Sequence, residues 1–266
     1  MGVDGDGGDA ELTAGAHDAH GDLAPVGDED LPEHGGAYRK RTHWDVRKFE
    51  SIESTNTWLL ERAREGAAEG LVAVADHQTA GRGRLGRRWE APAGVNLLCS
   101  VLLRPSAVSW LSVARVSLAG LEAAGVPSIG LKWPNDIVVG GSLKLAGVLA
   151  EVDAGAVVVG IGMNVGWAPP DLPATSLAAL AGTPVSRDDV LAGLLSSLSG
   201  WVEADDGAVA RAYREACVTI GRSVRVELAD ETFTGTAADV ADDGHLLVDV
   251  GMCVRDVSAG DVVHLR

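Results

Sequence analysis

The segment from Leu131 to Val165 decides the fold, and it reads LKWPNDIVVGGSLKLAGVLAEVDAGAVVVGIGMNV. Two apolar runs, at residues 131–139 and 145–152, flank Gly140-Gly141-Ser142, which predicts two strands paired across a short turn. The run from Val157 to Val165 is apolar at almost every position, as in a strand that is buried on both faces. We therefore expect this segment to form the centre of a β-sheet.

Outside this segment, strand-like runs alternate with amphipathic helical runs. The further expected strands lie at residues 46–52, 71–76 and 96–103. The expected helices lie at residues 54–64, 110–124, 175–181, 187–203 and 207–217, and Ser54 or Thr55 caps the first of them. This order predicts an α/β (α+β) domain in which helices flank a mixed sheet.

The pattern changes at Ile220, after which short alternating runs are separated by polar or glycine-containing turns. These runs lie at residues 223–228, 232–238, 245–250, 254–257 and 261–265. They predict a small all-β barrel or sandwich. The expected parts are therefore a segment 1–45, a main domain 46–219 and a β domain 220–266.

The charge of the chain is concentrated at its N-terminus. Of the 266 residues, 38 are acidic and 22 are basic, so the formal net charge is −16. Residues 1–38 contain ten acids and no Lys or Arg, which leaves a net charge of −6 for the other 228 residues. The N-terminal segment is rich in glycine and lacks apolar periodicity, so we expect residues 1–45 to be disordered.

Composition also restricts compartment and partners. No run of 18 uncharged apolar residues is present, so we expect no membrane association, and strong acidity argues against general nucleic-acid binding. Cys99, Cys217 and Cys253 are too widely spaced for a disulfide framework or a zinc-binding pair. We therefore expect a cytoplasmic protein without a metal site built from its own side chains.

The first motif that carries chemistry is a loop from Gln78 to Trp89, which reads QTAGRGRLGRRW. Its glycines, Gly81 and Gly83 among them, let the backbone approach a ligand closely, and its arginines offer planar forks for carboxylate or phosphate. Trp89 offers a face for stacking. The alternative is a mobile basic surface loop, and the Walker pattern of phosphate-binding loops is absent.

Two further motifs lie within the central segment. The chain has 18 Arg but only four Lys, and two of these, Lys132 and Lys144, flank a Trp-Pro-Asn-Asp turn. Such placement suggests that a compact ammonium is required there, although Asn135 and Asp136 alone could be turn formers. The third motif runs from Gly160 to Asn164; its glycines favour close passage of a ligand or a facing strand over a dinucleotide fold.

In this order and spacing, the motifs resemble the biotin protein ligase family. The matching segments are Ser54-Thr-Asn56, Gln78 to Trp89, Lys132 to Asp136, Lys144-Leu-Ala-Gly147 and Gly160 to Asn164. The resemblance extends from about residue 46 to the C-terminus. It implies the class II synthetase-like fold of biotin and lipoate ligases, followed by a small SH3-like β-barrel.

The resemblance implies that the chain adenylates biotin with ATP and Mg²⁺ and then transfers biotin to a lysine of a biotin carboxyl carrier protein. The arginines of the loop and Lys132 would neutralise the carboxylate and the triphosphate, while Asp136 would orient the incoming amine. The implied catalytic residues are Lys132, Arg84 and Asp136. The implied binding residues are Ser54, Thr55, Asn56, Gln78, Gly81, Arg82, Gly83, Arg84, Arg87, Trp89, Lys132, Asn135, Lys144, Gly147, Gly160 and Asn164.

More specific roles follow from the same resemblance. Ser54, Thr55 and Gln78 would line the biotin pocket together with Lys144 and the backbone of the arginine loop. Trp89 would pack on adenine, and Asn164 would lie near the nucleotide.

Two other functions remain open. A lipoate or octanoate ligase shares the fold, but the intact arginine loop disfavours it. A non-catalytic biotin sensor would not need cations that face a triphosphate, so the presence of Lys132 and the arginine loop disfavours this function. Bifunctional relatives carry an N-terminal DNA-binding domain, whereas the segment before residue 46 is short, acidic and unpatterned, so we expect no DNA binding.

Overall fold

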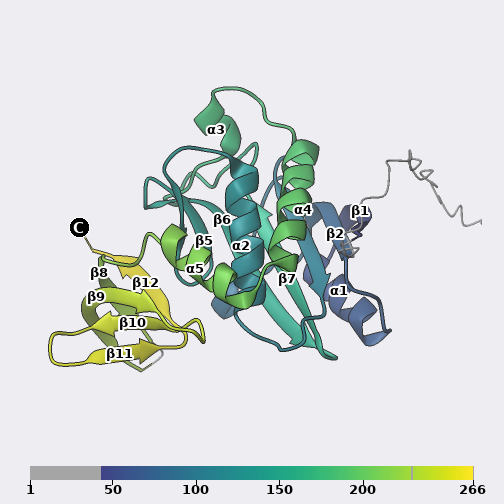
Figure 1. Ribbon diagram of the computed structural model, residues 1–266. Helices are drawn as coiled ribbons and strands as arrows, with labels where there is room; N and C mark the ends of the chain where they lie inside the picture. The colour runs from purple at the N-terminus through teal and green to yellow at the C-terminus, as the bar shows by residue number, and fades with distance from the viewer. Residues whose placement is uncertain (1–42, 229, 266) are drawn as a thin grey trace, which may run out of the picture. The chain divides into compact units, whose positions relative to one another are not determined.

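The computed structural model describes residues 43–228 and 230–265 (Figure 1). Nearly all of the acidic segment 1–45, which the sequence predicts to be disordered, lies outside the described residues. The first strand, β1 (Asp45–Ile52), begins one residue before its predicted start. Within the described ranges, no helix is both long and apolar enough to cross a membrane.

The main sheet has seven strands in the order β1-β2-β3-β7-β6-β5-β4. In that order the strands after β1 are β2 (Leu71–Gln78), β3 (Leu97–Leu103), β7 (Ala156–Met163), β6 (Leu143–Asp153), β5 (Asp136–Val139) and β4 (Ile129–Lys132). β1 is parallel to β2, and the other neighbours are antiparallel. The predicted mixed sheet and the central position of β7 are confirmed.

Helices cover both faces of this sheet because its strands alternate apolar side chains between the two sides. Val72 and Val74 of β2 belong to one core cluster, and Ala73 between them belongs to the other. α1 (Thr55–Arg64) packs on the second cluster through Leu59. The helices of the first cluster, with α2 and α4 in front of the sheet in Figure 1, are α2 (Leu111–Ala124), α4 (Arg187–Glu203) and α5 (Asp206–Ala216). The short α3 (Leu177–Ala181) follows β7 along the chain.

Side-chain caps define where the helices begin. The Ser54 hydroxyl accepts a hydrogen bond from the Thr57 N–H, which satisfies one of the free donors in the first turn of α1. Of the two predicted cap residues, Ser54 and Thr55, Ser54 is the one that caps the helix. α2 ends at Gly125, whose φ of 57° lies in the left-handed region that favours glycine.

The prediction of one strand over residues 131–139 is wrong. The chain reverses at Trp133-Pro134-Asn135, so that β4 and β5 form a hairpin in which Lys132 pairs with Asp136. Pro134 has no N–H to donate to a strand ladder, which favours a turn inside this apolar run. The pairing of β5 with β6 across residues 140–142 is confirmed.

The residues after Ile220 form a separate five-stranded antiparallel sheet in the order β11-β10-β9-β8-β12. Its strands are β8 (Ser223–Glu227), β9 (Thr232–Val240), β10 (Leu246–Asp249), β11 (Val254–Val257) and β12 (Asp261–His264). The five predicted alternating runs are thus five strands. The indole N–H of Trp133 donates to the Gly244 carbonyl at 2.9 Å, which ties this sheet to the β4–β5 hairpin.

Candidate functional site

A cavity of about 860 Å³ brings together the motifs that the sequence analysis singled out. All predicted site residues except Gly81 line it. They are Ser54, Thr55, Asn56, Gln78, Arg82, Gly83, Arg84, Arg87, Trp89, Lys132, Asn135, Asp136, Lys144, Gly147, Gly160 and Asn164. Gly81 lines a neighbouring cavity of about 840 Å³, and a Cβ there would lie 2.3 Å from the Trp89 carbonyl oxygen. Its role is therefore to let the two ends of the arginine loop approach each other.

The arginine loop is a closed turn held by its own backbone. The Gly83 N–H donates to the Arg87 carbonyl at 2.7 Å, and the Trp89 N–H donates to the Gly81 carbonyl at 3.0 Å. Leu85 at the tip has a positive φ of 54°, a conformation that is uncommon for a residue with a side chain. These bonds give the loop a defined shape, unlike the mobile surface loop considered as an alternative.

Two arginines of this loop are paired with carboxylates from distant segments. The Arg82 guanidinium lies 2.9 Å from Glu151 of β6, and Arg87 forms an ion pair with Asp261 of β12. Both carboxylates were missed in the sequence, where Glu151 follows an apolar run and Asp261 lies in the β domain. Sequence separations of 69 and 174 residues left no local signal for either pair.

Arg84 has neutral partners instead. Its guanidinium donates to the Asn135 side-chain oxygen and to the Gly260 carbonyl, both at 3.4 Å, and no carboxylate of the described chain lies within ion-pair distance. Burial lowers the pKa of Arg84, and the negative charge of Asp261 acts in the opposite direction. Arg84 therefore carries a charge that is only partly compensated.

The two lysines of the cavity, like its arginines, differ in whether a carboxylate pairs with them. The Lys144 ammonium of β6 lies 2.6 Å from the carboxylate of Asp136, the first residue of β5, so Asp136 holds Lys144 in place. The Lys132 ammonium has no hydrogen-bond or ion-pair partner among residues 43–228 and 230–265. Lys132 and Arg84 are thus the cavity cations that are free to meet an anionic ligand.

A buried polar network also lines the cavity. The Gln78 side-chain oxygen accepts from the Thr55 N–H at 2.8 Å and from its hydroxyl at 3.0 Å. The Ser100 hydroxyl donates to the Asn56 side-chain oxygen at 2.6 Å, and Asn56 in turn donates to Glu151 at 2.8 Å. Ser100 was also missed, because a lone serine in an apolar strand gives no functional signal.

Glycines make room for this arrangement. A Cβ on Gly160 would lie 2.4 Å from the Asn56 side-chain oxygen, and one on Gly162 would lie 2.4 Å from Cε2 of Trp89. The close passage predicted for these glycines is therefore that of two side chains of the site itself. The Trp89 indole N–H is buried and has no protein partner in the described part of the chain.

Asn164 acts as a brace at the end of β7. Its amide donates to the Thr175 carbonyl at 3.1 Å, and its side-chain oxygen accepts from Asn96 at 3.3 Å. These bonds hold the segment 166–175, whose Trp167 and Leu172 also line the cavity. This apolar wall was not predicted from the sequence.

Comparisons with known proteins identify the family of the chain. A family model described as the biotin/lipoate A/B protein ligase family matches residues 48–167, and one described as the biotin protein ligase C-terminal domain matches residues 219–265. The biotin–[acetyl-CoA-carboxylase] ligase of Mycobacterium tuberculosis is 44% identical over 231 residues, which cover 80% of this chain and 86% of that protein. The chain belongs to the biotin protein ligase family.

Other members of the biotin protein ligase family extend the comparison. The bifunctional ligase/repressor of Bacillus subtilis is 31% identical, over 79% of this chain and 71% of that protein. A solved biotin protein ligase of Aquifex aeolicus, in complex with biotin and ATP, has a TM-score of 0.71 at 28% identity and covers 84% of this chain and 99% of that chain. The family and the fold implied by the sequence resemblance are confirmed.

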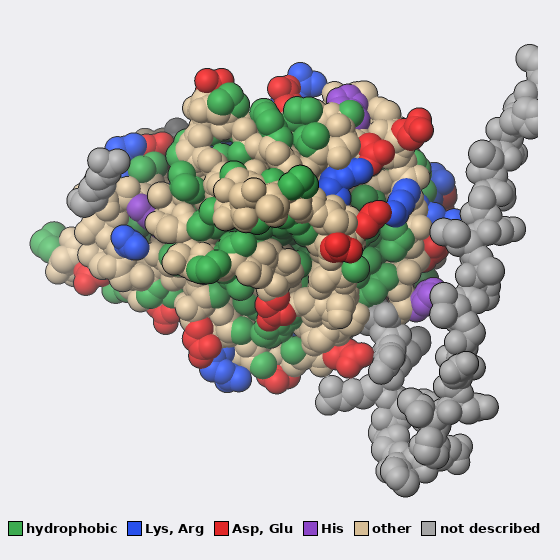
Figure 2. Space-filling model, turned by 90° about the horizontal axis from the view of Figure 1, so that it is seen from above, with side chains coloured by type: hydrophobic (Ala, Val, Ile, Leu, Met, Phe, Trp, Pro, Cys, Tyr) green, Lys and Arg blue, Asp and Glu red, His purple; other side chains and the backbone are tan. Residues whose placement is uncertain are grey.

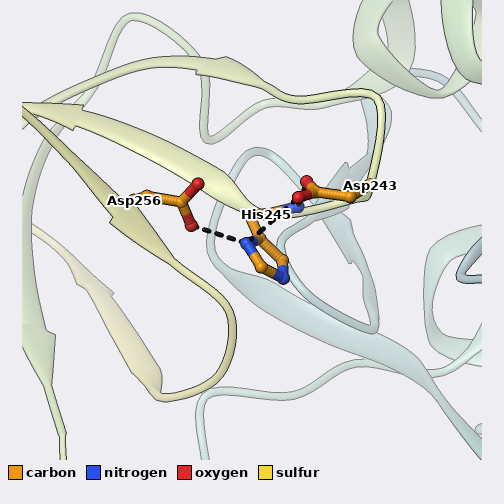
Figure 3. A group of neighbouring side chains, drawn as sticks. All are labelled: Asp243, His245 and Asp256. Atoms are coloured by element: carbon orange, nitrogen blue, oxygen red, sulfur yellow. Dashed lines mark hydrogen bonds and ion pairs between the residues drawn. The ribbon is translucent and has the colours of Figure 1, made fainter.

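The β domain of this biotin protein ligase family member also carries a group of three ionisable side chains (Figure 3). His245 lies 2.6 Å from Asp256 and 3.4 Å from Asp243 through its Nδ1 atom. The Asp256 pair joins β11 to the start of β10, so it braces the sheet.

On the face that Figure 2 shows, basic and acidic side chains lie next to one another and do not form a continuous basic area.

Proposed function

We propose that this chain is an ATP-dependent biotin protein ligase, which forms biotinyl-5′-AMP and transfers biotin to a lysine of a carrier protein. The observation that carries the proposal is the position of Arg84 and Lys132. They are cations without carboxylate partners in the described chain, and they line one cavity with a buried polar network. That combination suits a ligand with an uncharged polar ring together with two anions.

In the first step a biotin carboxylate oxygen attacks the α-phosphorus of ATP, the bond to the β-phosphate breaks, and pyrophosphate leaves. The two reactants are anions, so they repel one another until cations neutralise them. Arg84 and Lys132 would supply that neutralisation. Because Arg84 is partly buried, its charge is screened less than that of a surface arginine.

The polar network would hold the ureido ring of biotin. The Gln78 side-chain oxygen is already occupied by Thr55, so the Gln78 amide N–H groups remain available as donors. Buried polar groups of a ligand need such partners, because desolvation without hydrogen bonds is unfavourable. Lys144, held by Asp136, would complete this pocket.

In the second step the carrier lysine amine attacks the acyl carbon of biotinyl-5′-AMP, the bond from that carbon to the phosphate oxygen breaks, AMP leaves with the electron pair, and the new amide nitrogen loses a proton to solvent. Asp136 is proposed to orient that amine. The acyl adenylate is a mixed anhydride, so the closed arginine loop would protect it from water.

Mg²⁺ is proposed to arrive with ATP as its counterion and to screen the phosphates. The carboxylates of Asp136, Glu151 and Asp261 are each engaged by a cation. The protein residues thus fit a nucleotide-bound Mg²⁺ better than a cage of free carboxylates.

The carrier is proposed to be the biotin carboxyl carrier domain of an acyl-CoA carboxylase, since the Mycobacterium tuberculosis relative is named for acetyl-CoA carboxylase. We further propose that the protein is cytoplasmic and that neither nucleic acid nor a membrane is among its partners. The proposal includes the division into a catalytic domain 46–219 and a β domain 220–266, which the two sheets support.

The test is incubation of the purified protein with biotin, ATP, Mg²⁺ and an apo carrier domain, followed by mass spectrometry. A mass increase of one biotinyl group on the carrier lysine is expected. Competition between biotin and lipoate in ATP–pyrophosphate exchange separates the lipoate alternative. If the protein binds biotin but shows neither pyrophosphate exchange nor labelling of the carrier, the ligase proposal is refuted and the biotin-sensor alternative remains.

A further inference from the structure

The backbone on either side of Lys132 is held by the segment that links the two sheets. The Leu131 carbonyl accepts from the Val218 N–H at 2.8 Å, and the Trp133 N–H donates to the Thr219 hydroxyl oxygen at 3.0 Å. Gly130 makes this approach possible, because a Cβ there would lie 2.3 Å from Val218. The position of Lys132 therefore depends on Thr219.

Thr219 is fully buried and meets the β domain through His264 of β12. Its hydroxyl oxygen lies 3.0 Å from the His264 Nε2 atom. The oxygen already accepts from Trp133, so the hydroxyl hydrogen needs an acceptor. An unprotonated Nε2 is a good one, whereas the nearby Cys217 sulfur is a weak one.

The surroundings of His264 favour the neutral form of its ring. Burial lowers the pKa of His264, the charges of Lys132 and Arg222 lower it further, and a hydrogen bond with the Gly141 backbone acts in the opposite direction. The Cys217 thiol, which also contacts Thr219, has a pKa raised by burial and stays protonated. The neutral ring can thus accept the Thr219 hydrogen.

We propose that His264 is a positioning residue for Lys132. The neutral imidazole of His264 accepts the hydrogen of the Thr219 hydroxyl, and Thr219 in turn fixes the backbone at Trp133. This inference rests on the proposed function and goes beyond it, because it assigns the β domain a part in adenylation. Protonation would turn Nε2 into a donor, leave the Thr219 hydrogen with the sulfur alone, and place a third positive charge beside Lys132 and Arg222. Adenylation should therefore fall as the pH falls.

The first test needs no catalysis. The His264 Cε1–H signal of the full chain is followed by NMR against pH and is assigned by its loss in His264→Gln. We expect a midpoint below 6.5 in the wild type and a higher midpoint in Lys132→Ala, because the neighbouring charge is gone. An unchanged midpoint in Lys132→Ala would overturn the coupling.

The second test measures biotin-dependent ATP–pyrophosphate exchange from pH 5 to 8. His264→Gln offers a neutral acceptor that does not titrate, so we expect near-normal kcat at pH 8 and loss of the acidic decline. Thr219→Val leaves the Trp133 N–H without its partner, so kcat at pH 8 should fall by about tenfold with little change in the KM for biotin. Thr219→Ser should restore it.

His245→Gln is the matched control, because it removes another histidine of the β domain that is braced by Asp256 (Figure 3). It should keep the acidic decline of the wild type. An active wild type whose decline persists in His264→Gln would overturn the inference alone. A wild type without biotin-dependent exchange at any pH would overturn the proposed function, and the inference with it.

Discussion

Replacing Gly162 by alanine tests whether the Trp89 indole must lie directly against β7. The new Cβ would stand 2.4 Å from Trp89 Cε2 and 2.7 Å from its Nε1, whereas ordinary contacts begin at 3.4 Å. The indole must therefore move by about 1 Å into the cavity. Overpacking of this kind typically destabilises a protein by about 1–3 kcal/mol.

We expect Gly162→Ala to lower the melting temperature by about 2–12 °C, which is that free energy converted for a chain of this size. Base–aromatic stacking contributes about 1–3 kcal/mol per base, so a displaced indole should raise the KM for ATP by about fivefold, near the lower limit of that range. The KM for biotin should change less. Calorimetry and pyrophosphate exchange measure the two effects.

A matched control and a double mutant make the result decisive. Gly147→Ala also faces Trp89, but its nearest contact would be 3.1 Å, so a shift of a few tenths of an ångström relieves it. Its effects should be smaller on both measures. In a Trp89→Ala background, Gly162→Ala should no longer destabilise, because the opposing atoms are gone and alanine restricts the unfolded chain more than glycine. Equal destabilisation with and without Trp89 would refute the reasoning.

Four further outcomes are expected. Lys132→Ala should lower the adenylation rate by about 100-fold or more and leave the circular dichroism spectrum unchanged, because its ammonium has no partner in the described chain to lose; wild-type adenylation would refute its role. Arg84→Ala should release biotinyl-5′-AMP into solution faster, as measured by chromatography. Asp261→Asn should change the free energy of unfolding by less than about 1 kcal/mol, since the Arg87 and Asp261 side chains are 57% and 36% exposed, yet should also increase this leakage. Deletion of residues 1–38 should leave the rate unchanged, and a large loss would show that the segment takes part.

Local patterns were sufficient for most of the fold. The alternation in the β domain predicted each of its strands, and the Ser54 cap predicted the start of α1. The single strand expected over residues 131–139 failed because both arms of the hairpin are apolar, so hydrophobicity alone continues through Pro134. The pattern reports burial, and burial does not distinguish one long strand from two short ones.

The candidate site was less accessible to the sequence for a different reason. Motifs reveal residues that need a particular chemistry, and these are the arginines, lysines and glycines that line the cavity. Their partners need only an oxygen at the right place, as Ser100, Glu151 and Asp261 show. Such partners are positioned by the tertiary fold, and nothing in their local sequence marks them.

The distribution of charge explains how an acidic chain can handle anionic substrates. Carboxylates of the fold hold some cavity cations in place, and these pairs are Arg82 with Glu151, Arg87 with Asp261, and Lys144 with Asp136. Pairing orders the loop and the β6 lysine before a ligand arrives, so less conformational entropy remains to be lost on binding. Arg84 and Lys132 are the cavity cations without carboxylate partners in the described chain. They therefore give the cavity a positive electrostatic potential that attracts a carboxylate and a triphosphate. The net charge of −16 is a sum over the whole chain, whereas at physiological salt an exposed charge acts over only roughly 8 Å.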